Sequence, residues 1–160
     1  MSNFIIRPAH LSDVESIYTL IQNHRDLLVP RSLAHLVENI DRFAVACRDT
    51  TLVGCAAFQI HPEIGDVFAT TVEIQSVAVE EAYRKEGIGR ALVEAIIQRA
   101  SAFGTGEVLV LTFAPEFFRK LGFHEIAKTE VMHKLYTGCI NCTKHTNPFT
   151  CPEIAMKRDL

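Results

Sequence analysis

The sequence predicts a single α/β domain over residues 1–160, built around one mixed sheet. Its composition is that of an ordinary globular protein, with 48% hydrophobic and 22% charged residues. Stretches with helical periodicity alternate with short apolar stretches along the whole chain. No internal repeat and no linker rich in Gly, Ser or Pro divides it. A length of 160 residues suits one domain with its own hydrophobic core.

The first quarter of the chain is predicted to form one strand and two helices. The strand covers residues 3–9 and is stopped by its proline. The first helix covers residues 11–24, where Ser12 and Glu15 have the spacing of a capping box and the apolar residues recur on one face. A second, shorter helix is expected within residues 31–40, because its apolar residues keep the same spacing.

Three strands are predicted next. Residues 43–48 and 51–61 form two of them around the polar turn Asp49-Thr50. The third strand, residues 69–79, is the longest. A helix follows from Gly87 to Phe103 and is ended by Gly104. Its inward face is expected to carry Ile88, Ala91, Leu92, Ala95, Ile96 and Phe103.

The last third of the chain begins with a nearly all-apolar strand, residues 107–113, as expected for a central strand covered on both faces. A short helix within residues 115–123 starts with a proline and is closed by Gly122. Strands are predicted in residues 124–131 and 153–159. The order of elements is therefore βα(α)βββαβαββ, with antiparallel strands first and a βαβ unit in the middle.

Charge and hydropathy exclude several classes of partner. The net charge of −3 gives no bulk attraction to nucleic acid or to an anionic membrane. No apolar stretch approaches the roughly 20 residues that span a bilayer. The first ten residues, MSNFIIRPAH, lack the apolar segment and cleavage site of a signal peptide. We therefore expect a cytoplasmic protein.

A glycine-containing basic segment precedes the predicted helix that begins at Gly87. Backbone N–H groups at a helix start lack partners within the helix and carry the positive end of its dipole, so they can bind an anion. Gly87 and Gly89 leave room for one, and basic side chains flank them at Arg84, Lys85 and Arg90. The Walker pattern and the dinucleotide-binding pattern both fail here. The alternative is an ordinary tight turn with solvated charges.

The remaining pattern, Arg84-x-x-Gly87-x-Gly89 after a strand, resembles the signature of the GNAT superfamily of acetyl-CoA-dependent N-acetyltransferases. The later segment FFRKLGF also resembles one of theirs, and the order of elements matches theirs over nearly the whole chain. The resemblance implies a GNAT fold, with a mixed central sheet of about six or seven strands flanked by about four helices, and it implies acetyl-CoA as co-substrate.

By this resemblance, the amides of the basic segment hold the pyrophosphate of coenzyme A. The main chain of Val77 and Val79 pairs with the pantetheine arm like an extra strand, and the central strands splay apart to admit it. The residues implied to bind the cofactor are Val77, Ala78, Val79, Arg84, Lys85, Glu86, Gly87, Ile88, Gly89, Arg90 and Phe118.

Glu73 is the candidate general base. Acetyl transfer needs a neutral amine, so a carboxylate that takes up its proton is useful. Glu73 lies in the longest strand, where alternation puts Gln75, Val77 and Val79 on its face, and family members often place their base at this position. The alternative is a solvated glutamate or a salt bridge to a nearby arginine. A backbone N–H near Val77 is expected to stabilise the carbonyl oxygen.

The leaving thiolate has no obvious general acid. Many family members protonate it with a tyrosine, but Phe117-Phe118 occupies that position here. A thiol with a pKa near 8.5 leaves tolerably as the anion, so water or Tyr136 would suffice.

Three further stretches, containing LLVPRS, LTFAPEFFRKLGF and KLYTGCINC, look like the short amino-acid N-acetyltransferases of the N-acetylglutamate synthase type. Val29 stands where those enzymes usually have leucine. The resemblance implies acetylation of the α-amino group of glutamate, a step of arginine biosynthesis. Arg31 would clamp a substrate carboxylate, with Lys134 as a second contact. For both side chains, a solvated position is the alternative.

Five cysteines, an odd number, argue against a closed disulfide framework. Cys47 and Cys55 lie in strand-like stretches and are expected to be small buried hydrophobes. Cys139, Cys142 and Cys151 invite a zinc interpretation, because Cys-x-x-Cys has metal-ligand spacing. The second half of such a site supplies only one cysteine, so reduced cysteines packing a loop are favoured over a metal.

The sequence therefore predicts direct acetyl transfer from acetyl-CoA to a small amino acid, with glutamate favoured and without an acyl-enzyme. Another amine, such as a different amino acid, a polyamine or a protein N-terminus, is the rival acceptor. From a different functional class, the rival is a domain that binds acetyl-CoA without turnover. A homodimer is common in the family and is expected here.

Overall fold

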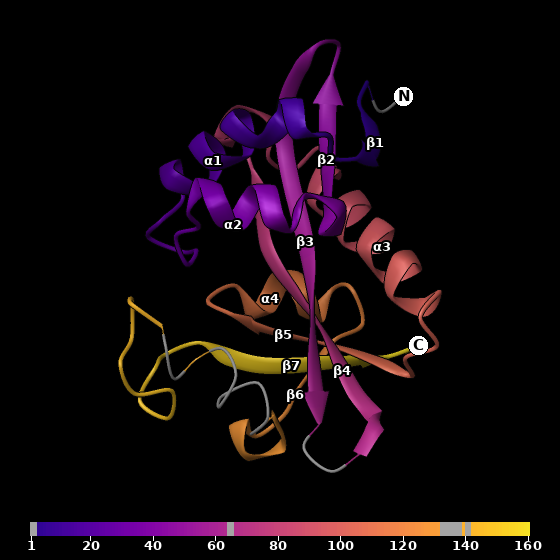
Figure 1. The fold of residues 1–160 in the computed structure, drawn as a ribbon, viewed down its shortest axis with the longest axis vertical. Coiled ribbons are helices and arrows are strands. Elements are labelled where there is room, and N and C mark those ends of the chain that lie inside the picture. The colour runs from indigo at the N-terminus through magenta and orange to yellow at the C-terminus, as the bar shows by residue number, and fades with distance from the viewer. Residues whose placement is uncertain (1–2, 64–65, 132–138, 140–141) are drawn as a thin grey trace. The chain divides into compact units, whose positions relative to one another are not determined.

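The computed structural model describes residues 3–63, 66–131, 139 and 142–160. Seven strands form one mixed sheet in the order β1-β2-β3-β4-β5-β7-β6 (Figure 1). The strands are β1 (Ile5–Pro8), β2 (Phe43–Arg48), β3 (Thr51–Glu63), β4 (Asp66–Val79), β5 (Glu107–Thr112), β6 (His124–Glu125) and β7 (Ile154–Asp159). Within these ranges the α-helices are α1 (Val14–Asn23), α2 (Leu33–Glu38), α3 (Ile88–Ser101) and α4 (Pro115–Arg119). The predicted fold class and order of elements are confirmed.

Contacts divide the chain into two compact units. Unit 1 comprises Met1–Phe58 and Ile74–Arg99, and unit 2 comprises Gln59–Glu73 and Ala100–Leu160. The long strands β3 and β4 each contribute residues to both units.

The core of unit 1 lies between its strands and its helices. In β2, Phe43, Val45 and Cys47 alternate onto one face and pack with buried residues of α1 and α2, among them Ile17 and Leu36. On the other side, α3 approaches β3 so closely that a Cβ built at Gly54 would lie 3.0 Å from Leu92 Cδ1 and 3.1 Å from the Ala78 carbonyl oxygen. A side chain at position 54 would therefore crowd the Leu92 side chain and the Ala78 carbonyl.

Unit 2 is organised by the apolar strand β5. It pairs in parallel with β4, through Val72 with Val108 and Glu73 with Leu109, and antiparallel with β7 along its whole length. The parallel pair confirms the predicted βαβ unit. In α4, Phe118 contacts Phe117 and Phe123 edge to face, at centroid distances of 5.0 and 5.3 Å.

Three details differ from the sequence prediction. The first helix is not capped by Ser12 and Glu15. Its first turn, Leu11–Asp13, is a 3-10 helix, and Asp13 Oδ2 accepts the His10 N–H at 2.7 Å while two hydrogen bonds from Arg7 hold that carboxylate. A contact from β1 therefore decides where the helix starts.

The strand expected over residues 124–131 is limited to β6. Lys128–Val131 is a 3-10 helix, and Glu130 Oε2 accepts the Ala127 N–H at 3.0 Å. Such a local side-chain bond offers the backbone an alternative to the strand ladder.

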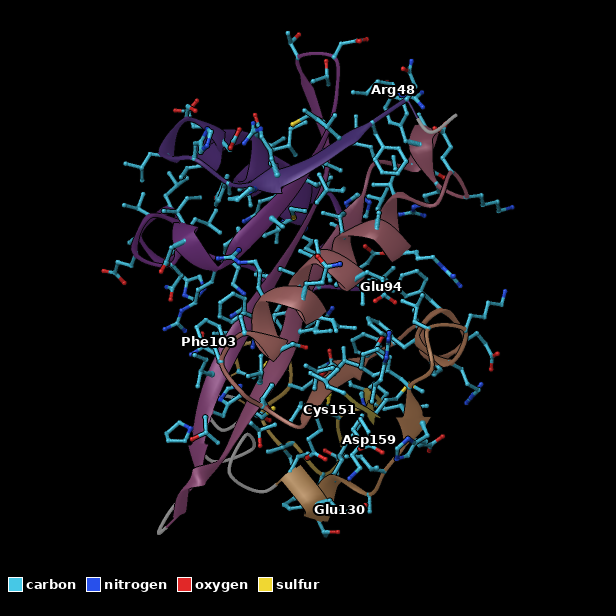
Figure 2. The ribbon with its side chains drawn as sticks, turned by 90° about the vertical axis from the view of Figure 1, so that its right-hand side faces the viewer. Arg48, Glu94, Phe103, Glu130, Cys151 and Asp159 are labelled. Atoms are coloured by element: carbon cyan, nitrogen blue, oxygen red, sulfur yellow. The ribbon has the colours of Figure 1, made fainter. Side chains whose placement is uncertain are left out.

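Phe103 does not face inward. It lies after the end of α3, where the Phe103 N–H bonds the Ala100 carbonyl and Gly104 has φ 79°. The helical period therefore stops before Phe103 is reached, and its side chain is 60% exposed (Figure 2). The inward positions near this end of the helix are held by Ile97 and Ala100 instead.

Candidate functional site

The segment before α3 has the backbone of an anion-binding loop. Lys85 and Gly87 both have left-handed φ values, 68° and 87°. The Ala91 N–H makes a helical bond to the Gly87 carbonyl, so the amides of Ile88, Gly89 and Arg90 belong to the first turn of α3. A Cβ built at Gly87 would meet no atom within 4 Å. The loop therefore offers first-turn amides and an open approach to them.

A cation from the end of β2 holds the same loop in unit 1. The guanidinium of Arg48 bonds the carboxylate of Glu86 and lies over the Tyr83 ring, 4.9 Å from its centroid. Arg48 is labelled near the top of the view in Figure 2. Arg84, Lys85, Gly87 and Arg90 are exposed, whereas the side chain of Ile88 is buried and anchors the helix start. Glu86, expected at the cofactor, is thus engaged by Arg48.

β4 carries a local distortion between the predicted base and the predicted pantetheine contacts. Ser76 has φ 54°, which a non-glycine residue seldom adopts in a strand. Its carbonyl accepts a hydrogen bond from the buried Cys55 thiol at 3.3 Å. Strict alternation from Glu73 to Val77 and Val79, expected from the sequence, is therefore interrupted. Such distortions of a strand often lie next to active sites, where they redirect side chains and backbone groups.

Glu73 is buried and paired with a histidine. Its carboxylate Oε2 lies 2.7 Å from Nε2 of His61, which stands on β3. Both side chains are 5% exposed. A glutamate is almost never this deeply buried without a partner, because the desolvation of its charge is costly. The pair places a buried, hydrogen-bonded carboxylate on β4.

Arg31 lies in unit 1 just before the N-cap of α2. Ser32 caps that helix by accepting the His35 N–H at 3.1 Å, so its position relative to α2 is fixed. Arg31 Nη2 donates to Gln75 Oε1 at 3.0 Å, which ties the guanidinium to β4. Burial lowers the pKa of His35, and the nearby positive charge of Arg31 lowers that pKa further. An arginine held in this way presents a planar, doubly donating group suited to a carboxylate.

The predicted roles of Phe118 and Lys134 stay predictions. Phe118 is 4% exposed within the aromatic cluster of unit 2, and its contact with the cofactor stays a prediction. Lys134 lies outside the described residues, as does Tyr136, the candidate general acid.

Cys139, Cys142 and Cys151 are half-buried thiols. The Cys142 N–H bonds the Cys139 carbonyl, and Lys128 Nζ donates to the carbonyls of Pro148 and Cys151, so backbone bonds organise this segment. Among the residues that the structure describes, no group of three or more His, Cys, Asp or Glu is arranged to hold a metal. No helix in that part of the chain is long and apolar enough to cross a bilayer.

His61 and Gln75 contact two of the predicted site residues, Glu73 and Arg31. Sequence reasoning missed His61, and it placed Gln75 on the face of Glu73 without giving it a role. Neither stands in a recognisable motif. One signal was present: a histidine and a glutamate in neighbouring strands of largely apolar sequence must satisfy each other or another group when both are buried.

A sequence model of the acetyltransferase (GNAT) family matches residues 11–123. The chain is 34% identical over 157 residues to an uncharacterized N-acetyltransferase of Chlorobaculum tepidum, covering 97% of this chain and 96% of that protein. It is 33% identical over 136 residues to an amino-acid acetyltransferase of Mycobacterium tuberculosis, covering 82% of this chain and 75% of that protein.

Among solved structures, the fold is similar to that of N-acetylglutamate synthase from Neisseria gonorrhoeae complexed with coenzyme A and N-acetyl-glutamate. The TM-score is 0.80 at 26% identity. The match covers 98% of this chain and 35% of that one, so this chain spans about a third of the longer enzyme.

Proposed function

The chain belongs to the acetyltransferase (GNAT) family, whose members transfer acetyl groups from acetyl-CoA, and we propose that its acceptor is the α-amino group of L-glutamate. Transfer to an amino acid follows from the amino-acid acetyltransferases to which it is similar. Glutamate as the acceptor is supported by the likeness to a synthase complexed with N-acetyl-glutamate. The reaction would serve arginine biosynthesis.

One observation carries the proposal: Arg31 is held by Gln75, and Gln75 follows Glu73 by two residues on β4. An amino-acid acceptor brings a carboxylate and a protonated amine separated by one carbon. A guanidinium and a carboxylate base are the two groups that recognise such a pair. We propose that Arg31 binds a substrate carboxylate, with Lys134 as a second contact, and that Glu73 accepts the amine proton.

Acetyl-CoA is proposed to bind along the segments that lead into α3. The amides from Lys85 to Arg90 would hold its pyrophosphate, since the open space beside Gly87 admits an anion. The main chain around Val77, Ala78 and Val79 would pair with the pantetheine arm. β4 pairs with β5 in parallel through Val72 and Glu73. The splaying of the central strands is proposed from the family resemblance.

The chemical step requires no covalent enzyme intermediate. Glu73 takes a proton from the ammonium group, so an N–H bond breaks and an O–H bond forms. The neutral amine attacks the thioester carbonyl, so an N–C bond forms and the C–S bond breaks. The thiolate of coenzyme A leaves, and the nitrogen gives its second proton to water, which yields the neutral amide. A backbone N–H near Val77 would stabilise the oxyanion. Neither Phe117 nor Phe118 has a hydroxyl to protonate the thiolate, so water or Tyr136 is proposed to do so.

The test is release of the coenzyme A thiol with glutamate, with other amino acids, with a polyamine, with a peptide and with no acceptor. We expect glutamate-dependent release, reduced by about 10²-fold in Glu73→Gln, since general base catalysis contributes on this order. Raising the pH should partly restore that variant, because more of the amine is then neutral. Glu116→Gln removes an exposed carboxylate and should behave as wild type.

Release with a different amine and none with glutamate would overturn the proposed acceptor. Binding of acetyl-CoA without thiol release with any acceptor would favour the alternative, a domain that binds acetyl-CoA without turnover.

We propose two further properties. A cytoplasmic location is proposed because the odd number of cysteines argues against a closed disulfide framework. A homodimer is expected from the family resemblance alone, and sedimentation analysis of the purified protein measures it.

A further inference from the structure

The buried pair of His61 and Glu73 has a geometry that points to a specific role. Oε2 of Glu73 and Nε2 of His61 are 2.7 Å apart, a length typical of charge-assisted hydrogen bonds. With Glu73 ionised, as a general base requires, its carboxylate only accepts hydrogen bonds, so Nε2 carries the hydrogen and donates it. The contact joins two strands over a separation of 12 residues, and both side chains are 5% exposed.

This hydrogen bond has a consequence for any proton transfer by Glu73. A glutamate side chain has three rotatable bonds, and its carboxyl group can turn both oxygens through many orientations. A donor fixed at Oε2 removes most of that freedom. It also stabilises the ionised form, the form that can accept a proton, in a buried position where an unpaired carboxylate would tend to become neutral.

We propose that His61 is the positioning residue of the catalytic base, holding Oε2 of Glu73 so that its other oxygen accepts the proton of the substrate ammonium. The inference rests on the proposed function, in which Glu73 is that base. The step balances without a further reactant: the N–H bond of the ammonium breaks, the O–H bond of Glu73 forms, and the electron pair stays on the nitrogen. His61 acts through Glu73 and does not itself contact the amine.

A double-mutant cycle tests this role, because a residue that acts through Glu73 loses its effect when Glu73 is no longer a base. We expect His61→Leu to lower kcat for glutamate acetylation on the order of 10- to 100-fold, as misplacement of a catalytic group does, with KM for acetyl-CoA unchanged. The same substitution in a Glu73→Gln protein should cause no further fall in kcat.

Conservative replacements separate orientation from folding. The amide nitrogen of Gln reaches the position of Nε2, whereas that of Asn reaches only that of Nδ1. We therefore expect His61→Gln to keep most of the wild-type kcat and His61→Asn to lose it, at equal circular dichroism. If His61→Leu fails to fold, these two variants replace it in the cycle. His24→Leu is the matched control, since His24 is also buried but its Nδ1 contacts the Leu20 carbonyl, and kcat should be unchanged.

Three results would overturn the proposal: an unchanged kcat in His61→Leu, an equal loss in the wild-type and Glu73→Gln backgrounds, or an equal loss in the Gln and Asn variants. The failure of the proposed function looks different. In that case Glu73→Gln itself would retain wild-type kcat, and the assignment of the base would fall together with that of its partner.

Discussion

At the scale of single residues, two buried carboxylates in the described part of the chain are held by named partners. Glu73 is held by His61, and Asp13 is held by two hydrogen bonds from Arg7 at 2.7 and 2.9 Å. The two pairs differ in their setting. The first is buried on neighbouring strands, whereas the second ties β1 to the start of α1 and leaves Arg7 30% exposed. The second pair is therefore a structural contact whose strength can be measured through stability.

The hydrogen bond from Arg7 is the largest cause that lowers the pKa of Asp13 below its ordinary value of 3.8. A lowered carboxyl pKa stabilises the fold above pH 3.8, and this stabilisation is lost as the pH falls through the folded-state pKa. We expect Asp13→Asn to reduce the free energy of unfolding at pH 7 by about 1–2 kcal/mol. Urea denaturation between pH 7 and pH 3 measures it.

The difference between wild type and Asp13→Asn should shrink as the pH falls below 3.8, because the wild-type carboxyl then becomes neutral too. Asp49→Asn is the control, since Asp49 stands exposed in the β2–β3 turn with φ 52°, a conformation that asparagine tolerates. A difference that stays constant with pH would contradict the role given to the charge of Asp13.

The buried thiol of Cys55 also bears on the chemistry of the reaction. Burial raises the pKa of its thiol to about 12, so the thiolate is not formed at neutral pH. A buried thiol that donates to the Ser76 carbonyl cannot serve as an acyl-accepting nucleophile. This agrees with the proposed direct transfer from acetyl-CoA to the amine.

At the scale of elements, α3 has a positive-φ glycine on each side. Gly87 precedes the helix and has φ 87°, and Gly104 follows it and has φ 79°. A Cβ built at either position would meet nothing within 4 Å. The two glycines therefore have similar positive φ values and similar open space at the Cβ position. They differ in the end of the helix dipole beside them, which is the positive end at Gly87 and the negative end at Gly104.

This symmetry gives a matched pair of variants. We expect Gly87→Ala and Gly104→Ala to cost a similar free energy of unfolding, about 1–2 kcal/mol each, because alanine is strained at positive φ. Only Gly87→Ala should raise KM for acetyl-CoA, since its methyl group would stand where the pyrophosphate approaches the first-turn amides. Thermal unfolding and initial rates measure the two effects. An equal rise of KM in both variants would refute the pyrophosphate assignment to this loop.

At the scale of the whole molecule, the two compact units share two strands. The chain passes from unit 1 to unit 2 within β3, after Phe58, and back within β4, after Glu73. Strand residues on either side of such a junction belong to one hydrogen-bonded ladder. We therefore propose that residues 1–160 form a single domain.

A single domain of this size should unfold in one cooperative transition. Far-ultraviolet circular dichroism and tyrosine fluorescence, which is usable because the chain has no Trp, should give the same midpoint. Acetyl-CoA at about 100 times its Kd should stabilise the fold by about 2.7 kcal/mol and shift the whole transition. Two transitions, of which only one responds to acetyl-CoA, would show two domains.

Features that depend on neighbours a few residues apart could be predicted from the amino-acid sequence. Periodicity gave the order of helices and strands, the turn residues ended them at Asp49 and Gly104, and Gly87 marked the loop before α3. These patterns succeed because the backbone conformation of a turn or a helix is set by contacts between residues only a few positions apart in the sequence. The same reasoning singled out Glu73 as an unusual carboxylate in a strand.

Contacts between residues far apart in the chain could not be predicted from local patterns and are set by the folded arrangement of strands and helices. His61 meets Glu73 across 12 residues, Arg31 meets Gln75 across 44, and Arg7 fixes the start of α1 in place of Ser12 and Glu15. Each depends on strand register and on the packing of separate elements, which a local pattern does not contain. The inward position predicted for Phe103 is wrong for a related reason. The helix α3 ends at Ser101, so the helical spacing does not extend to Phe103, which is exposed.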